Sequence, residues 1–224
     1  ALMMKGREGD RRLFARGSKL NVMAMHNSNG LDPNTLAQGI NLASYQLNAD
    51  DLTEFIKLFE HAHDFGSLIQ IPPHLADKLP GFNNLVQSET HNPDLFVSEA
   101  LQQLKPLVAQ ANILAAQYDA VVANPPYMGS KGMNTVVKKF AKDNYKGYEK
   151  DLFSAFIDRD LTFSKPHGRL GFMSPFVWMF ISSHEHLRTR LIDSETITSL
   201  VQLEYSGFDG ATVPICTFTL QKGH

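Results

Sequence analysis

Several common sequence signals are absent from this chain of 224 residues, and each absence narrows its class. The single cysteine, Cys216, excludes an internal disulfide, and it lies in the apolar run 213–220, where a packed core thiol is expected. No apolar run approaches the length of a membrane helix, and no signal peptide opens the chain. We therefore expect a cytoplasmic protein with no membrane partner.

Signals for metal binding and for nucleotide hydrolysis are also missing. His61 and His63, and again His184 and His186, are two residues apart, so the members of each pair point to different faces of a helix. No Cys-x-x-Cys or His-Glu-x-x-His motif accompanies them. The glycines after residue 128 do not form the phosphate loop of nucleoside triphosphatases. We expect surface histidines and no metal site.

Neither sign of charge is in excess, since 21 basic side chains face 23 acidic ones and the formal net charge is −2. Contact with nucleic acid would therefore depend on a local basic patch. One stretch combines six lysines with three aromatic residues, namely Lys131, Lys138, Lys139, Phe140, Lys142, Tyr145, Lys146, Tyr148 and Lys150. Both a solvated helix face and a strip that binds the DNA backbone are compatible with this pattern.

The most informative stretch is a strand that ends in a proline turn. Residues 120–123 form a short apolar run, typical of a buried parallel strand. Asn124, Pro125, Pro126 and Tyr127 follow directly. The two prolines fix their φ angles and lack N–H donors, so the strand must end here. The turn presents an amide side chain, unpaired carbonyl groups and an aromatic ring.

These groups suit a planar amine, whose lone pair is delocalised and therefore a poor nucleophile. The Asn124 side-chain oxygen and the Pro125 carbonyl can accept the amine hydrogens and stabilise the positive charge that develops on nitrogen. Tyr127 can stack on the attached ring, which contributes about 1–3 kcal/mol for a nucleobase, comparable with the cost of unstacking it. We predict that Asn124, Pro125, Pro126 and Tyr127 are the catalytic residues.

The eleven residues 124–134, Asn-Pro-Pro-Tyr-Met-Gly-Ser-Lys-Gly-Met-Asn, resemble the catalytic motif of S-adenosylmethionine-dependent adenine-N6 DNA methyltransferases. They are most similar to the PglX family of BREX phage-defence systems. The resemblance implies methyl transfer from S-adenosylmethionine to the N6 of a flipped adenine, in DNA modification or phage defence. It implies contact with the DNA substrate by Tyr127, Lys131 and Phe208, and contact with the cofactor at the edge formed by Asn124.

The cofactor half of such a site is missing from the sequence. A methyltransferase of this kind needs a glycine-rich loop after its first strand and an acidic residue after its second, and no such loop precedes residue 124. The resemblance thus implies an inactive fragment of the catalytic domain. Such a fragment would leave an exposed sheet edge that a second copy could cover as a homodimer. Other defence-system subunits are further expected partners.

The expected fold class is α/β, with a partial Rossmann-like class I methyltransferase sheet. We expect a mostly parallel sheet with a C-terminal antiparallel hairpin and helices on both faces. Residues 1–31 and 116–224 would form the core, and residues 32–115 a helical insertion in the same domain. The expected strands are 19–26, 120–123, 169–175, 197–203 and 213–221. The expected helices are 1–14, one that starts at 50, 75–79, 92–118 with a kink or break at Pro106, one capped by Asp151 that runs to about 161–163, and 184–191.

Other functions are compatible with the same residues. Protein-glutamine N5-methyltransferases share the motif, because a side-chain amide poses the same chemical problem as a ring amine. Cytosine-N4 methylation is a close variant, whereas cytosine-C5 methylation needs a cysteine nucleophile that the motif strand does not offer. A non-catalytic DNA-binding or assembly module would explain the missing glycine loop.

Overall fold

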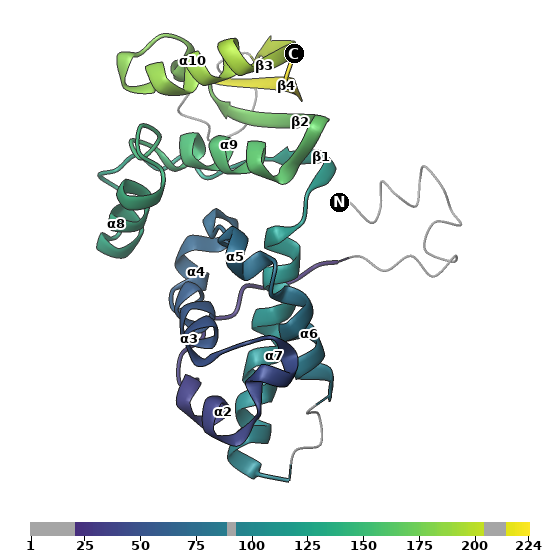
Figure 1. Cartoon of the computed structure of the whole chain (residues 1–224). Coiled ribbons are helices and arrows are strands. Elements are labelled where there is room, and N and C mark those ends of the chain that lie inside the picture. The colour runs from purple at the N-terminus through teal and green to yellow at the C-terminus, as the bar shows by residue number, and fades with distance from the viewer. Residues whose placement is uncertain (1–20, 89–92, 204–213) are drawn as a thin grey trace, which may run out of the picture.

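The computed structural model describes residues 21–88, 93–203 and 214–224. They form two neighbouring parts: a helical part from the first half of the chain, and a sheet part with its own helices from the second half (Figure 1). The expected helix over residues 1–14 and the expected substrate contact Phe208 lie outside the described residues.

The helical part has a core of its own. Its elements are α2 (Pro33–Gly39), η1 (Leu42–Tyr45), α3 (Ala49–Leu58), α4 (Ala62–Phe65), η2 (Gly66–Leu68), α5 (Pro73–Ala76), α6 (Leu79–Ser88) and α7 (Leu95–Ala115). α3 starts with a capping box, in which Asn48 and Asp51 each bond the other's backbone N–H, both at 2.9 Å. Phe55 of α3 stacks on Phe82 of α6 with ring centroids 4.2 Å apart, and both are fully buried.

Two expectations for this part were wrong. The expected break at Pro106 is wrong, because α7 runs without interruption from Leu95 to Ala115, while the expected kink there stays a prediction. Buried Leu104 and Leu107 flank this proline, so packing holds the helix although one backbone donor is missing. The expected helix over 75–79 is replaced by the separate helices α5 and α6, each of which has a proline in its first turn.

The expected strand over 19–26 is also wrong within the described residues, because 21–28 have no regular structure. A side-chain amide, and not a neighbouring strand, forms the hydrogen bonds to the backbone of this segment at His26. The amide of Gln110, on α7, accepts a hydrogen bond from the His26 N–H at 2.9 Å and donates one to the His26 carbonyl at 3.0 Å. Gln110 is 1% exposed, so a buried amide satisfies this peptide and no sheet partner is needed.

The sheet part contains a mixed sheet in the order β1-β2-β4-β3. Its strands are β1 (Tyr118–Ala123), β2 (Ser164–Pro175), β3 (Glu195–Gln202) and β4 (Ile215–Lys222). β1 and β2 are parallel, whereas β4 is antiparallel to both β2 and β3. The α/β class and the antiparallel C-terminal pair are confirmed. Because one of the three described pairings is parallel, the sheet is mixed where we expected it to be mostly parallel.

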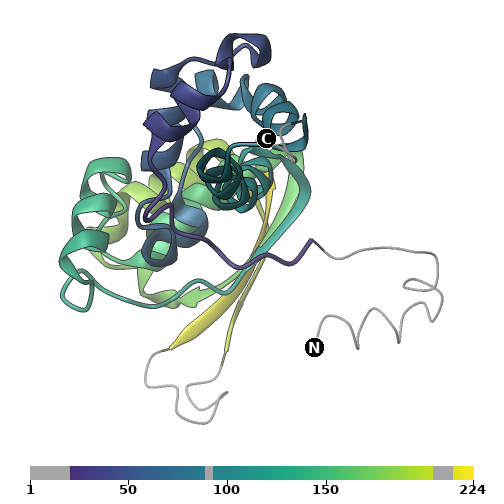
Figure 2. The same cartoon turned by 90° about the horizontal axis from the view of Figure 1, so that it is seen from below.

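Helices cover one face of this sheet. They are α9 (Leu152–Phe163), η3 (Phe176–Met179), η4 (Ser182–His184) and α10 (Glu185–Ser194), whereas α8 (Thr135–Asn144) packs in a separate cluster against the helical part. Ile157 of α9 and Leu187 of α10 pack in one cluster with Phe172 of β2 and Phe218 of β4. Figure 2 shows the helices gathered on one side of the strands. The second layer of helices that we expected is not found among the described residues.

The strand that carries the motif is exposed, contrary to our expectation of a buried strand. β1 is the edge strand of the described sheet, and Val122 on its uncovered face is 85% exposed. Val121, which points to the covered face, is half-buried and packs against the cores of both parts. Among the described residues, no further strand pairs with the outer edge of β1 or of β3, and one face of the sheet is open.

Candidate catalytic site

The proline turn lies where the carboxyl ends of two parallel strands meet. Ala123 pairs with Phe172, so Asn124 leaves β1 beside the last residues of β2. The carboxyl edge of a parallel pair is the usual site of ligand binding in open α/β sheets. Asn124 is exposed and Pro125 is buried, so the turn is anchored at its first proline while its amide side chain faces outward.

Within the turn, Asn124 and Tyr127 contact each other. The Tyr127 hydroxyl donates a hydrogen bond to Asn124 Oδ1 at 3.2 Å. The Tyr127 ring is half-buried against the cluster that contains Phe172 and Phe218, and this burial raises the pKa of its hydroxyl. The hydroxyl therefore stays protonated at neutral pH, and it fixes which way the Asn124 amide points.

The turn is tied to the start of α9. Asp151 caps α9, as expected, by accepting a hydrogen bond from the Phe153 N–H at 3.3 Å. The same carboxylate oxygen also accepts one from the Met128 N–H at 3.0 Å. Burial raises the pKa of Asp151, while hydrogen bonds from Phe153, Met128 and Leu152 act to lower it. Nothing in the sequence pattern indicated the second contact, because it links residues 23 positions apart.

The lysine-rich stretch separates into exposed cations and packed aromatic rings. All six of its lysines are exposed, including Lys131 in the loop after the turn. Phe140, however, stacks on Phe65 with centroids 3.9 Å apart. Tyr145 is 1% exposed, and its hydroxyl donates to the Leu68 carbonyl at 2.5 Å. These two rings hold α8 against the helical part, so they are not available to stack on bases.

The histidines only partly match our expectation. His61, His63 and His186 are exposed or half-buried, but His184 is 4% exposed and lies against Phe153 with ring centroids 5.0 Å apart. Burial lowers the pKa of His184, so its ring is neutral at physiological pH. Among the described residues, no cluster of three or more potential ligands is positioned to hold a metal ion.

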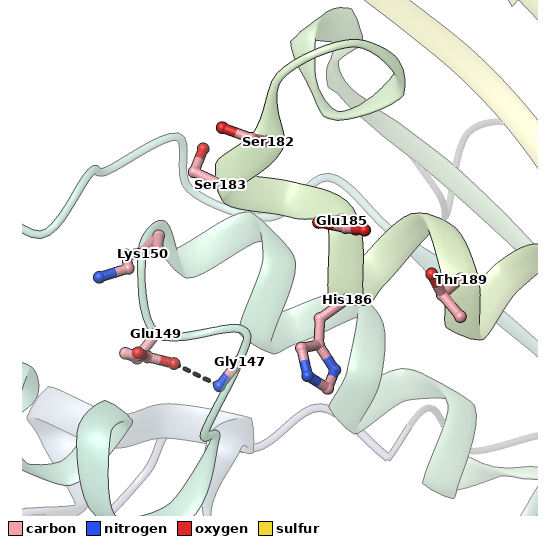
Figure 3. A pocket seen from close by; sticks show the side chains of 8 residues that line it. All are labelled: Gly147, Glu149, Lys150, Ser182, Ser183, Glu185, His186 and Thr189. Carbon is pink, nitrogen blue, oxygen red and sulfur yellow. Dashed lines mark hydrogen bonds between the residues drawn. The ribbon is translucent and has the colours of Figure 1, made fainter.

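A polar groove of about 520 Å³ lies between the segment before α9 and the start of α10 (Figure 3). Its lining residues are Gly147, Glu149, Lys150, Ser182, Ser183, Glu185, His186 and Thr189. Gly147 has φ +94°, and a Cβ there would lie 3.0 Å from the His186 ring, so the wall requires glycine. Two carboxylates, Glu149 and Glu185, offset the ammonium group of Lys150, so the groove has no preference for an anion by charge alone.

The described residues supply only one edge of a binding site for a methyl donor. Asn124 borders the carboxyl end of β1, but no acidic residue or glycine loop from a preceding strand lies beyond this edge among the described residues. Pro126 and Tyr127 do not replace these groups. Both belong to the turn after β1, whereas the acceptor for ribose hydroxyls in such a site lies at the end of a neighbouring strand. The set present does not fit a complete S-adenosylmethionine site.

Comparison with known proteins gives matches over most of the chain. The family described as Eco57I restriction-modification methylase matches residues 17–208. The adenine-specific methyltransferase BrxX of Escherichia coli O9:H4 (strain HS) is 33% identical over 100% of this chain and 20% of BrxX. The adenine-specific methyltransferase PglX of Lacticaseibacillus casei (strain Zhang) is 28% identical over 99% of this chain and 19% of PglX.

Two further matches have a lower coverage of the chain or a lower identity. The type II restriction enzyme and methyltransferase RM.Eco57I of Escherichia coli is 30% identical over 47% of this chain. A solved structure of a putative class I S-adenosylmethionine-dependent methyltransferase from Listeria monocytogenes aligns with 97% of the chain at a TM-score of 0.39 and 14% identity. The chain spans about a fifth of the length of BrxX and PglX.

Proposed function

The chain belongs to the Eco57I restriction-modification methylase family, and from this premise we propose that it is part of the catalytic domain of an adenine-N6 DNA methyltransferase. Its similarity to BrxX and PglX along its whole length supports a role in phage defence by DNA modification. The observation that carries the proposal is the Asn-Pro-Pro-Tyr turn at the joint carboxyl edge of β1 and β2, with Asn124 exposed and oriented by Tyr127.

The proposed chemistry assigns the motif residues to the amine. A flipped adenine would lie against Tyr127, and its N6 hydrogens would face Asn124 Oδ1 and the Pro125 carbonyl. Asn124 Oδ1 has two lone pairs, so it can accept one N6 hydrogen while the Tyr127 hydroxyl occupies the other position. As N6 would bond to the methyl carbon while the carbon–sulfur bond of the donor breaks, positive charge would develop on N6, both acceptors would stabilise it, and one N6 proton would then be lost to water. Pro126 keeps the turn rigid. S-adenosylmethionine, held largely by residues outside this chain, would supply the methyl group.

The DNA backbone is the proposed partner of the exposed lysines. Lys131 follows the catalytic turn directly, and Lys138, Lys142, Lys146 and Lys150 are exposed along the next segment. Each such contact displaces a counterion, which makes binding salt-dependent. Phe208 remains the proposed second wall of the adenine site. The proposed reaction also places the protein in the cytoplasm, where the chromosome and the cofactor are found.

The open edge of β1 is the proposed junction with the cofactor half. A strand that pairs with β1 would bring a glycine loop to the carboxyl edge beside Asn124, and would also shield Val122. We assign this position to another part of the same longer protein, with residues 32–115 as a helical insertion in the catalytic domain. A homodimer that pairs two β1 edges, and contacts with other defence-system subunits, are alternatives for the same surface.

The test uses the full-length protein that contains this chain. It is incubated with methyl-labelled S-adenosylmethionine and either DNA that lacks adenine methylation or a release factor, and products are identified by mass spectrometry. We expect N6-methyladenine in the DNA, and a rate at least about 100-fold lower for Asn124→Ala. Asn144→Ala, an exposed change on α8, is the matched control and should retain full activity. Methylation of glutamine instead of adenine would refute the proposal.

A further inference from the structure

Asp151 forms a side-chain contact that helix capping does not require. We propose that Asp151 is a positioning residue for the catalytic turn: its carboxylate holds the Met128 peptide and thereby sets the orientation of Tyr127 and Asn124. The proposal rests on the function proposed above, but the contact is a property of the chain itself. Asp151 Oδ1 lies 3.0 Å from the Met128 nitrogen and 3.3 Å from the Phe153 nitrogen, so one oxygen joins the turn to α9.

The composition of the turn explains why it needs an external anchor. Pro125 and Pro126 have no N–H, so the turn cannot be held by donors at these two positions. Met128 is the first residue after them whose N–H forms a hydrogen bond among the described residues. Its acceptor is a carboxylate, and hydrogen bonds to charged groups are about twice as strong as those between neutral groups. The anchor therefore lies one residue beyond Tyr127.

Backbone bonds align the two segments around this carboxylate. The Leu152 N–H donates to the Met128 carbonyl at 3.0 Å, and the Ser130 N–H donates to the Lys150 carbonyl at 2.9 Å. Gly129 and Asp151 form an antiparallel bridge between them. A Cβ on Gly129 would still lie 3.6 Å from Asp151 Oδ2, so the carboxylate packs closely along this bridge. The Met128 peptide is thus fixed through both its N–H and its carbonyl.

The geometry constrains Tyr127 from both ends. Its backbone is one residue from the anchored Met128 peptide, and its hydroxyl bonds Asn124 Oδ1 at 3.2 Å. If Met128 is released, the Tyr127 ring and the Asn124 amide lose their fixed relation, and the two acceptors for the amine no longer converge. Misplacement by about 1 Å can reduce a catalysed rate about 100-fold. Asp151 itself does not contact the reacting atoms in this arrangement.

Two substitutions separate capping from positioning. Asp151→Asn keeps an oxygen at the same distance, so it retains both hydrogen bonds without the charge. Asp151→Ser retains the cap, because serine is about as good an N-cap as aspartate. Its side chain is one bond shorter, so it cannot bond the Met128 N–H in addition to the Phe153 N–H. Asp32→Ala is the matched control, since Asp32 caps α2 through the Asn34 N–H at 2.9 Å and lies outside the sheet part.

The first measurement is amide hydrogen exchange of the peptide that spans residues 125–131 in the full-length protein. We expect about tenfold faster exchange in Asp151→Ser, a smaller change in Asp151→Asn, and none in Asp32→Ala. Unchanged exchange in Asp151→Ser would overturn the proposal. Hydrogen exchange does not depend on enzymatic activity, so this measurement tests the positioning role even if the wild-type protein transfers no methyl group. A lack of methyl transfer would instead refute the proposed function.

The second measurement is the split between kcat and KM for DNA. A positioning role predicts that Asp151→Ser lowers kcat by at least about tenfold while KM changes by less than about threefold, and that Asp151→Asn recovers much of the loss. If Asp151 had a purely structural role, kcat would fall in both variants only in proportion to their loss of folded protein. Full kcat in a folded Asp151→Ser variant would therefore contradict the proposal.

Discussion

The helical part and the sheet part differ in how completely they bury their surfaces. In the helical part, Phe55, Phe59, Phe82 and Leu104 are all 0% exposed. In the sheet part, Phe218 and Cys216 on the covered face are also buried, with exposures of 1% and 0%. On the opposite face, Val122 is 85% exposed and Val201 is 53% exposed. Proteins rarely leave a strand edge and a sheet face uncovered without a partner.

The difference shows which surfaces this chain completes by itself. The helical part forms a closed core, although Leu95 and Phe96 at the start of α7 are exposed, whereas one face of the described sheet has no covering layer. The proline turn lies on this incomplete part, since it follows β1, which is an edge strand with an exposed face. Cofactor binding should therefore depend on what covers β1, while the stability of the helical part should not. The predictions below test this contrast, from the largest expected effect to the smallest.

The largest effect is expected in the helical core. Phe82→Ala removes a fully buried ring that stacks on Phe55, and large-to-small changes of this kind cost about 3–5 kcal/mol. Urea unfolding of the 224-residue chain, followed by circular dichroism, should show a loss in this range. A cost near zero would mean that the helical part is not the closed core described above.

The next effect concerns the link between the two parts. Arg159 on α9 donates hydrogen bonds to the carbonyls of Ser67, Ile69 and Leu114, all in or next to helical-part elements, at 2.8–2.9 Å. Arg159→Met keeps much of the packing but leaves buried acceptors without a donor, which costs about 1–3 kcal/mol. We expect separate unfolding transitions for the two parts in calorimetry. A single unshifted transition would show that they are joined by other contacts.

A pH-dependent effect is expected at Asp160. Burial raises the pKa of this carboxyl to about 7, and its Oδ2 has no hydrogen-bond partner within residues 21–88, 93–203 and 214–224. The folded state thus favours the protonated acid, so the stability that this group contributes is present below its ordinary pKa and is lost as pH rises through about 7. The change in the free energy of unfolding caused by Asp160→Asn should therefore be more favourable at pH 8 than at pH 4.5, by at least about 1 kcal/mol. Thermal melts at both values test this sign.

The smallest effects are expected on the open surface. Val122→Thr changes an 85% exposed side chain, so its effect on unfolding should be within about 0.5 kcal/mol. Calorimetric titration of this chain with S-adenosylmethionine should give no detectable heat, because the residues present supply only one edge of the site. Micromolar binding would show that the chain completes the cofactor site without further segments.

Local chemistry predicted the elements that depend on neighbouring residues. The strand before Asn124, the Asp151 cap of α9 and the antiparallel pair β3–β4 are all encoded by short patterns. The Asn-Pro-Pro-Tyr turn was located from the apolar run before it and from its two prolines. The roles proposed for its four residues remain predictions.

Contacts between distant segments could not be predicted in the same way. The Gln110 amide replaces a strand partner for His26 across 84 positions, so an apolar stretch that looked like a strand stays irregular. Phe140 and Tyr145 looked available for bases, but both are taken up by packing against the helical part. His184 looked like a surface residue because periodicity does not reveal which helix face is covered. Each case depends on which segments meet.

Helix α9 connects two features that were described separately. Its cap, Asp151, holds the catalytic turn, and Arg159, eight residues later and about 12 Å along the helix axis, holds the helical part. A helix of this length is stiff, so a displacement at one end becomes a displacement at the other. We therefore expect a shift of the helical part to move α9 and, through Asp151, the Met128 backbone beside Asn124 and Tyr127.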